Sequence, residues 1–407
     1  MDHHGLDALF SPRSVAVFGA SDKKGAVGCV VWDNLRTSTF AGARWPIHPT
    51  RTELHGERVY ASLQDLPETP ELGIVCTPPA TVPGIVDDLA DRGTRAVIVI
   101  TAGLDDAQRA RLLAAHERTG IRIQGPNCIG TIAPRASLSA SFAHAGARPG
   151  DLAFVTQSGA LMTAMLDWAN ARGLGFSHFV SLGDQLEIDC ADLLTVLARD
   201  DATKAILLYL ESVQDSAKFL AAAREAASKK PVIVVKAGRS EAGSRAAASH
   251  TGALAGSDFV FDAAARRAGM LRVDSVHDLF LAAETLACLS DRAPKRLTVL
   301  TNGGGAGVLA ADACAHYGVT MAELSSSTRE QLDALLPANW SHGNPVDILG
   351  DAPVARYVAA LTALLEDENA GSILFVHAPT AIVPSAQIAR ALLPLANGST
   401  NQPKRLM

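Results

Sequence analysis

Short apolar runs rich in β-branched residues alternate with Ala- and Leu-rich stretches along almost the whole chain, and this alternation restricts the fold more than any other feature. Each apolar run has the length of a strand, and each Ala- and Leu-rich stretch has the length of a helix. Strands and helices that alternate in this way form parallel sheets whose crossover helices cover both faces. The sequence therefore predicts an α/β protein.

The apolar runs form three groups, which predict three domains. Strands are expected at 14–19, 45–48, 72–76, 96–100 and 121–124 in the first group, and at 151–156, 176–181, 205–210 and 231–236 in the second. Residues 290–295 are polar and contain a proline, as is typical of a linker. The third group has only two clear strands, 297–301 and 372–377. Because such a unit normally has about four or five strands, we expect the third domain to be incomplete or to need a partner.

Composition and charge exclude several classes of function. A formal net charge of -6 gives no attraction to nucleic acid phosphates or to an anionic membrane, so a small-molecule ligand is expected. The six cysteines lie far apart and form no zinc-type cluster, so we expect no metal site and a reducing, cytoplasmic environment. The N-terminal segment lacks the pattern of a signal peptide, and no apolar run approaches the roughly eighteen residues of a membrane span.

The turns after the first-domain strands carry candidate ligand contacts. Gly19, Gly25 and Gly28 lie between a predicted strand and a helix, where backbone N–H groups can bind a phosphate. The next strand ends in His-Pro-Thr and lacks the acidic residue that binds the ribose of NAD, so NAD is disfavoured. The sequences CTPPA (76–80), TAG (101–103) and GPNCIG (125–130) end three further strands, at the edge where parallel sheets bind ligands. For each turn alone, an ordinary tight turn is the alternative.

The second and third domains each place a small polar turn before a helix. In the second domain the turn is Gln157, Ser158 and Gly159, and in the third it is Asn302 followed by Gly303 to Gly305. Free N–H groups and the positive end of the helix dipole could hold a phosphoryl group at either turn. A serine N-cap is the simpler interpretation of the first. Two such turns in different domains suggest a phosphoryl group that moves between two stations.

A histidine in a segment of small residues is the candidate nucleophile. His250 lies in the sequence ASHTGALAG, which predicts a loop able to approach another surface closely. Glu211 ends the predicted strand 205–210 and could orient the imidazole or favour its charged form. A surface histidine and an ordinary strand-end carboxylate are the alternatives.

Taken together, these motifs resemble the NDP-forming acyl-CoA synthetases, relatives of succinyl-CoA synthetase, and most closely the α subunit of the ADP-forming acetyl-CoA synthetases. The motifs are GASDKKGAVG, CTPPA, GPNCIG, TQSGAL, SHTGALAG, TNGGGAG and NPVDILGDA, in family order. The resemblance implies a CoA-binding Rossmann-like domain (1–135) and two flavodoxin-like ligase domains (150–290 and 296–407), the last incomplete. It also implies the reaction acyl-CoA + ADP + phosphate ⇌ carboxylic acid + CoA + ATP, through an acyl phosphate and a phosphohistidine.

The resemblance further implies roles for single residues. His250 falls on the phosphorylated histidine and Glu211 on its supporting carboxylate. CoA or acyl-CoA contacts fall on Gly19, Ser21, Gly25, Gly28, Arg51, Thr77, Pro78, Pro79 and Asn127. The second strand ends in His-Pro-Thr, where the family usually has an Asn-Pro-Lys-like run. A basic contact to the CoA phosphates would therefore fall to Arg51 or be lost. Phosphate contacts fall on Gln157, Ser158, Gly159, Asn302, Gly303, Gly304 and Gly305, and no metal ligand is expected.

The resemblance also implies a partner. We find no ATP-grasp domain in the sequence, so Mg-ADP or ATP is expected to bind a separate β subunit or a fused domain, in a hetero-oligomer acting on a small carboxylic acid. Two other functions stay open: the synthetase-like body of a protein lysine acetyltransferase, and a non-catalytic CoA-sensing module. Because the acetyltransferase fusions usually lack the phosphorylated histidine, His250 favours the synthetase.

Overall fold

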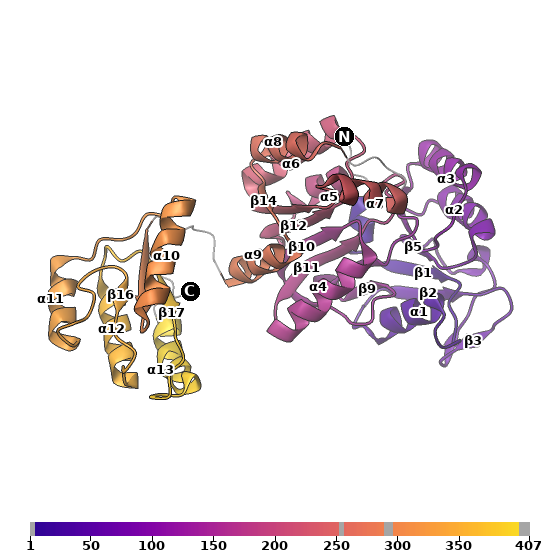
Figure 1. The fold of residues 1–407 in the computed structure, drawn as a ribbon. Helices are drawn as coiled ribbons and strands as arrows, with labels where there is room; N and C mark the ends of the chain where they lie inside the picture. Colours follow the sequence, from indigo (N-terminus) through magenta and orange to yellow (C-terminus); the bar gives the residue numbers. More distant parts are fainter. Residues whose placement is uncertain (1–4, 252–255, 289–295, 399–407) are drawn as a thin grey trace. The chain divides into compact units, whose positions relative to one another are not determined.

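The computed structural model describes residues 5–251, 256–288 and 296–398, and the chain divides into two compact units, Met1–Ala287 and Cys288–Met407 (Figure 1). The larger unit contains two parallel sheets, and the smaller contains one. Every strand expected from the sequence is present within two or three residues of its predicted bounds. The α/β prediction is therefore confirmed.

The first sheet is wholly parallel, in the order β2-β1-β5-β6-β7, so the winding direction reverses between β1 and β5. Helix α1 covers one face, and α2 and α3 cover the other. A short hairpin and three 3₁₀ turns complete this part. The bounds are β1 (Ser14–Phe18), β2 (Ala43–Ile47), β3 (Glu53–Leu54), β4 (Glu57–Arg58), β5 (Leu72–Val75), β6 (Ala96–Val99), β7 (Arg122–Gln124), α1 (Val27–Thr37), α2 (Val82–Asp91), α3 (Asp106–Thr119), η1 (Leu6–Leu9), η2 (Leu63–Asp65) and η3 (Pro79–Thr81).

The second sheet repeats this winding, in the order β14-β13-β12-β10-β11, and β8 and β9 add an antiparallel edge beside β11. The direction reverses between β10 and β12. Helices α4 and α9 pack on one face, and α5, α6 and α8 on the other. The bounds are β8 (Gly130–Ala133), η4 (Pro134–Ala136), β9 (Leu138–Ser141), β10 (Arg148–Thr156), β11 (Gly175–Ser181), β12 (Ala205–Leu210), β13 (Val232–Lys236), β14 (Leu271–Val273), α4 (Gly159–Arg172), α5 (Cys190–Leu197), α6 (Ser216–Lys229), α7 (Glu241–Thr251), α8 (Asp258–Ala268) and α9 (Val276–Cys288).

The smaller unit contains a three-stranded parallel sheet in the order β16-β15-β17. The sequence predicted two of these strands and missed the third, which is only two residues long. One face carries α10 alone, while α11, α12 and α13 cover the other. The bounds are β15 (Leu297–Thr301), β16 (Val346–Asp347), β17 (Ser372–Val376), α10 (Gly304–Tyr317), α11 (Ser326–Leu335), α12 (Val354–Glu366) and α13 (Ser385–Gly398).

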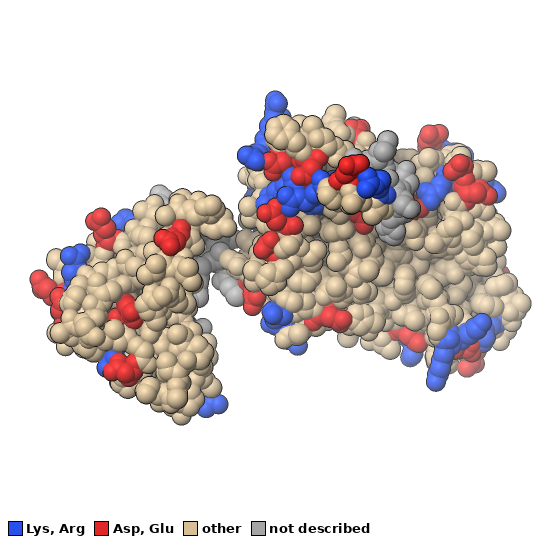
Figure 2. All heavy atoms as spheres, viewed as in Figure 1, with Lys and Arg blue, Asp and Glu red and all other residues tan. Residues whose placement is uncertain are grey.

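Two further features of the molecule concern its surface charge and the length of its apolar helices. On the face of the molecule in Figure 2, basic and acidic side chains are interspersed. Within the residues that the structure describes, no helix combines the length and the apolar character needed to cross a membrane.

Buried polar contacts join the two sheets of the larger unit. Glu187, in the loop after β11, accepts hydrogen bonds from Arg122 Nε (2.8 Å) and from the Ile123 N–H group (2.7 Å) of β7. The Ile188 N–H group donates to the Ile123 carbonyl at 3.1 Å. Both charged side chains of this pair are about one-tenth exposed or less. This loop therefore runs along β7 and fixes one sheet against the other.

Replacing one partner of this buried pair should destabilise the larger unit. Arg122→Met leaves the Glu187 carboxylate buried without its cation, which costs about 3 kcal/mol of unfolding free energy. Urea unfolding of the full chain, followed by circular dichroism, measures the loss. The double variant Arg122→Met/Glu187→Leu should recover much of it, because no unpaired charge then remains.

Arg118→Met is the matched control. Arg118 contacts Asp91 and Asp87 on the surface, and its side chain is about half exposed. The loss of this side chain should therefore barely change the urea concentration at the unfolding midpoint. Equal midpoints for Arg122→Met and Arg118→Met would contradict a joining role for the buried pair.

Candidate functional site

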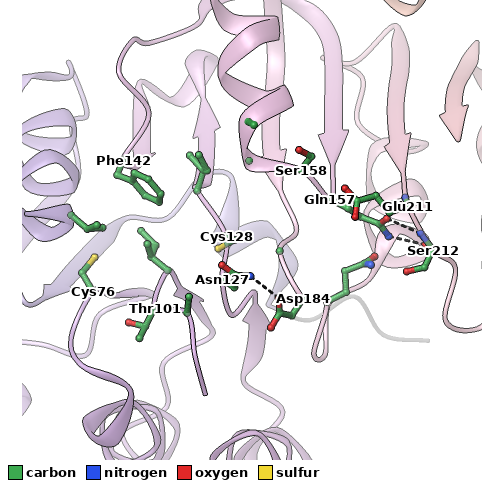
Figure 3. A pocket seen from close by; sticks show the side chains of 18 of the residues that line it. Cys76, Thr101, Asn127, Cys128, Phe142, Gln157, Ser158, Asp184, Glu211 and Ser212 are labelled. Atoms are coloured by element: carbon green, nitrogen blue, oxygen red, sulfur yellow. Dashed lines mark hydrogen bonds between the residues drawn. The ribbon is translucent and has the colours of Figure 1, made fainter. Parts of the chain in front are cut away.

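One pocket of about 680 Å³ collects the carboxyl ends of strands from both sheets of the larger unit (Figure 3). The first sheet supplies residues 76–78 after β5, 100–102 after β6 and 127–129 after β7. The second supplies 157–160 after β10, 183–185 after β11, and 211, 212 and 214 after β12. Val27 and Phe142 complete the lining. Ligands of open parallel sheets bind where the winding reverses, and this pocket includes residues from the reversal points of two sheets.

A glycine turn lies beside the pocket at the start of α1. Gly19 has φ +87°, and a Cβ added there would lie 3.1 Å from Thr77 Cγ2. A Cβ on Gly28 would collide with the Gly19 carbonyl oxygen, so α1 can begin this close to β1 only with glycine at that position. No side chain caps the N-terminus of α1. The Cys29 N–H group donates to the Ala26 carbonyl at 3.0 Å, so among the first residues of α1 the N–H groups of Val27 and Gly28 remain available to an anion.

The predicted contacts Ser21 and Arg51 belong to the same turn. Ser21 Oγ accepts a hydrogen bond from the Lys23 N–H group at 3.0 Å. Arg51 forms an ion pair with Asp22, 2.7 Å apart, and its side chain is 38% exposed. The structure therefore places the guanidinium at the glycine turn, where Asp22 already neutralises it. Gly25 lies in open space with φ +81°, and Pro79 begins the 3₁₀ turn after β5.

The β7 turn and the β11 turn pack directly on one another. The Asp184 N–H group donates to the Pro126 carbonyl (2.9 Å), and the Leu186 N–H group donates to the Gly125 carbonyl (3.0 Å). Asn127 Nδ2 donates to Asp184 Oδ1 at 3.0 Å across the pocket, as drawn in Figure 3. Arg109 of α3 pairs with the same carboxylate. Asn127 is therefore held at the point where the two sheets meet.

The Gln157 side chain binds the backbone at the end of β12. Its Oε1 accepts from the N–H groups of Glu211 and Ser212, and its Nε2 donates to the Ser212 carbonyl at 2.8 Å. The side chain thereby fixes the end of β12 beside the end of β10. Because the Nε2 group carries two N–H donors, a phosphate contact from the second donor would leave these bonds intact.

Ser158 caps α4 and leaves the start of that helix open. Its Oγ accepts from the Leu161 N–H group at 3.4 Å, and its own N–H group donates to Thr156 Oγ1 at 2.9 Å. The N–H groups of Gly159 and Ala160 have no hydrogen-bond partner within the described residues. Both residues line the pocket, so the positive end of α4 faces it.

Glu211 is 6% exposed and lies at the pocket margin after β12. Behind it, Lys236 Nζ donates to the Glu211 carbonyl (2.8 Å) and to the Ala237 carbonyl (2.6 Å). Burial lowers the pKa of Lys236, while the Asp258 and Glu211 carboxylates oppose that shift. Lys236 therefore ties the Glu211 segment to the end of β13, from which the chain continues to α7.

His250 falls in the last turn of α7, and its side chain lies outside the described residues. The small residues 246–249 and 251–255 around His250 predicted a loop, and this was wrong for residues 246–251 because α7 continues to Thr251. Three consecutive alanines favour the helix, although their small size had suggested a loop. The role of His250 stays a prediction.

The smaller unit repeats the turn at the start of α4. The Gly303 N–H group donates to Thr301 Oγ1 (3.0 Å), as Ser158 does to Thr156. The amide of Asn302 pairs with both backbone groups of Ala378 at 2.8 Å, as the Gln157 amide pairs with β12. Helix α10 has no side-chain cap, so its cradle would consist of N–H groups near Gly304 and Gly305.

The surroundings of the two pocket cysteines favour the neutral thiol. Cys76 and Cys128 both line the pocket, and burial raises the pKa of Cys76 strongly and that of Cys128 to about 12. Cys76 is partly exposed, while Cys128 is buried and its Sγ donates to the Val99 carbonyl at 3.4 Å. Neutral thiols are poor nucleophiles and poor metal ligands. No cluster able to hold a metal ion occurs among the described residues.

Three families match successive parts of the chain. Residues 13–134 match the CoA binding domain, 149–286 the succinyl-CoA ligase like flavodoxin domain, and 297–400 the Ligase-CoA domain. The acetate–CoA ligase [ADP-forming] I subunit alpha of Pyrococcus furiosus is 35% identical over 401 residues, covering 95% of this chain and 86% of its own. The chain belongs to the ADP-forming acyl-CoA synthetase family. Its similarity is to the α-subunit-like region of these synthetases.

Further comparisons agree with this family. Acetate–CoA ligase [ADP-forming] I of Archaeoglobus fulgidus is 40% identical over 394 residues, which are 95% of this chain and only 57% of that enzyme. The chain thus spans a little over half of that synthetase. The dinucleotide-forming acetyl-coenzyme A synthetase 1 of Ca. Korarchaeum cryptofilum, solved with phosphate and ADP, superposes with a TM-score of 0.93 at 32% identity, covering 98% of this chain and 88% of that one.

The structure brings together only part of the site predicted from the sequence. Thr77, Pro78, Asn127, Gln157, Ser158, Gly159 and Glu211 all line the one pocket. Asn302 and Gly303 to Gly305 belong to the smaller unit. Sequence reasoning missed Asp184 and Phe142, and it included Ile129 only as part of the GPNCIG turn. Asp184 follows the predicted strand 176–181, so the expectation that ligands bind after parallel strands, which selected Asn127, could also have selected Asp184. Phe142 follows β9, a strand that the sequence analysis did not predict.

The pocket cysteines should resist alkylation while the chain is folded. Because their pKa values lie far above neutrality, almost no thiolate exists at pH 8, and we expect iodoacetamide to label Cys76 and Cys128 at least about a hundredfold more slowly than in urea. Raising the pH to 9 should change this little. Peptide mass mapping identifies the labelled positions, and rapid labelling of either residue at pH 8 would contradict neutral, buried thiols.

Proposed function

We propose that this chain is the α-type region of an ADP-forming acyl-CoA synthetase, which exchanges a CoA thioester for an acyl phosphate and then for a phosphohistidine. The observation that supports this proposal is a single pocket lined by residues from two sheets, at the places where the winding direction of each sheet reverses. A thioester held by the CoA-binding domain and a phosphate at the N-terminus of α4 would meet there. This reaction needs a CoA binding domain and a succinyl-CoA ligase like flavodoxin domain. The chain matches both, one after the other along the sequence.

Two displacements make up the proposed chemistry. An oxygen of inorganic phosphate attacks the thioester carbonyl, the C–S bond breaks, and CoA leaves as the thiol after taking a proton. A ring nitrogen of His250 then attacks the phosphorus, and the carboxylic acid leaves with the bridging oxygen. Imidazole divides one difficult transfer into two easier steps. The unpaired N–H groups of Gly159 and Ala160 would stabilise the charge on the transferring phosphoryl group.

Glu211 supports the histidine in this proposal. Its position at the pocket margin and the bonds that Gln157 and Lys236 make to its backbone favour a fixed carboxylate. A carboxylate beside one ring nitrogen selects the tautomer whose other nitrogen attacks, and it stabilises the cationic ring.

A nucleotide-binding partner completes the reaction. Relatives named subunit alpha imply a β subunit. We propose that an ATP-grasp β subunit or fused domain binds Mg-ADP and receives the phosphoryl group from His250, with the α10 N-terminus at Gly303 to Gly305 as the second cradle. The observation behind this part is the matching turn geometry at Thr156 and Thr301.

CoA binding tests the first part of this proposal. Gly28→Ala puts a methyl group against the Gly19 carbonyl, which must push the start of α1 away from the proposed phosphate position. We expect CoA affinity, measured by calorimetry on the full chain, to fall at least about tenfold. NADH should not bind.

Gly84→Ala is the control for that experiment. Gly84 lies in α2, and a Cβ there would meet no atom within 4 Å, so CoA affinity should stay at the wild-type value. Tight NADH binding by the wild-type chain, with none for CoA, would refute the proposal.

His250 phosphorylation tests the second part. With acyl-CoA and labelled phosphate, and without nucleotide, the chain should take up acid-labile phosphate. His250→Ala should abolish this uptake with CoA affinity nearly unchanged, and Glu211→Gln should slow it about 10- to 100-fold by analogy with other carboxylate-oriented histidines. Uptake by His250→Ala at the wild-type rate would exclude His250 as the phosphorylated residue. Normal CoA binding by the wild type with no phosphate uptake would favour a CoA-sensing module.

A further inference from the structure

The pocket has an apolar wall next to the start of α4. Ile129 lies against the first residue of the helix, since a Cβ on Gly159 would be 2.7 Å from Ile129 Cγ1. Phe142 lines the same pocket, on the side away from Ser158 and Glu211 in Figure 3. A group bound beside the Gly159 and Ala160 N–H groups would therefore lie close to the Ile129 side chain.

Backbone bonds hold this wall in place. The Ile129 N–H group donates to Ser181 Oγ (3.1 Å), and its carbonyl accepts from the Phe142 N–H group (3.1 Å). Both side chains are only partly buried. Ile129 packs on the core beneath α4, and Phe142 packs on the core that extends under the first sheet. The exposed surfaces of Ile129 and Phe142 face the pocket, so the fold fixes where both side chains meet a bound group.

The charged groups at the pocket are all acidic. The described residues that line it include Asp184 and Glu211 but no lysine, arginine or histidine. Asp184 is paired with Arg109 and Asn127, so the Arg109 guanidinium is already engaged. An acyl group that carries a free carboxylate, such as succinyl, would find no cation among these side chains, and Glu211 would repel it.

We propose that Ile129 and Phe142 are the specificity-determining residues for the acyl group. In this arrangement the phosphate lies at the N–H groups of Gly159 and Ala160, the thioester carbonyl lies beside the phosphate, and the acyl chain lies against Ile129 and then Phe142. The wall limits the acyl group to a short, uncharged chain. This inference rests on the proposed function, because it assumes that an acyl-CoA enters the pocket.

Acyl-CoA affinities test the wall without requiring turnover. Calorimetry on the full chain compares CoA, acetyl-CoA, hexanoyl-CoA and succinyl-CoA. The wild type should bind acetyl-CoA more tightly than hexanoyl-CoA or succinyl-CoA. Phe142→Ala should raise the ratio of hexanoyl-CoA to acetyl-CoA affinity at least about tenfold, since each methylene in an apolar pocket changes discrimination about tenfold or more.

Conservative variants keep the test decisive if Phe142→Ala fails to fold. Phe142→Leu and Ile129→Val should raise the same ratio by smaller factors, about threefold to fivefold. Phe259→Ala is the matched control, because Phe259 lies on α8 of the same unit with 80% of its surface exposed, and its ratio should equal that of the wild type.

Two results separate this inference from the proposed function. If CoA binds every folded variant normally while the hexanoyl-to-acetyl ratio stays at the wild-type value, the wall is not where the acyl group lies. If succinyl-CoA binds the wild type more tightly than acetyl-CoA, the acyl group is not restricted to an uncharged one. Failure of the wild-type chain to bind CoA at all would instead refute the proposed function.

Discussion

The contact between the turns after β7 and β11 determines the rest of the site. Gly183 has φ +60°, and any Cβ there would collide with the carbonyl oxygens of Pro126 and Asn127, so the two turns meet backbone to backbone. The bonds from Asp184 and Leu186 to Pro126 and Gly125 close this contact. Each parallel sheet would otherwise keep its own crevice at its own reversal point. Because the turns touch, those crevices merge, and groups bound by either sheet come within reach of the other.

The same local device recurs where a helix leaves a central strand. A threonine ends the strand, its hydroxyl accepts the N–H group two residues later, and the amide side chain between them binds the neighbouring strand. Thr156 with Gln157 and Thr301 with Asn302 follow this scheme. The polar side chains in these turns therefore organise the backbone beside the first N–H groups of α4 and α10. The hydrogen bonds of Gln157 and Asn302 give both residues a structural role in addition to the phosphate contacts that the sequence predicts for them.

The sequence predicted the fold well where the signal was local. Buried runs such as 205–210 and 297–301 are rich in apolar and β-branched residues, and the turns after them mark the edge of the sheet. The prediction failed where a strand is short or its partner lies far along the chain. β8 and β9 have four residues each, β8 pairs with the distant β11, and β16 has only two residues. The amides of Gln157 and Asn302 are engaged by residues more than fifty positions away, so their structural role could not be inferred from TQSG or TNGG.

The unpaired N–H groups at the start of α4 have a consequence for the energetics of a relay. Neutral donors attract a phosphoryl group through partial charges, while a lysine or arginine would supply a full one. The described lining of the pocket offers the former and none of the latter. In the proposed transfer, a phosphoryl group held only by neutral donors would be bound less tightly than one held by a full positive charge. It would therefore need less free energy to leave for the next acceptor, in either direction of the reaction.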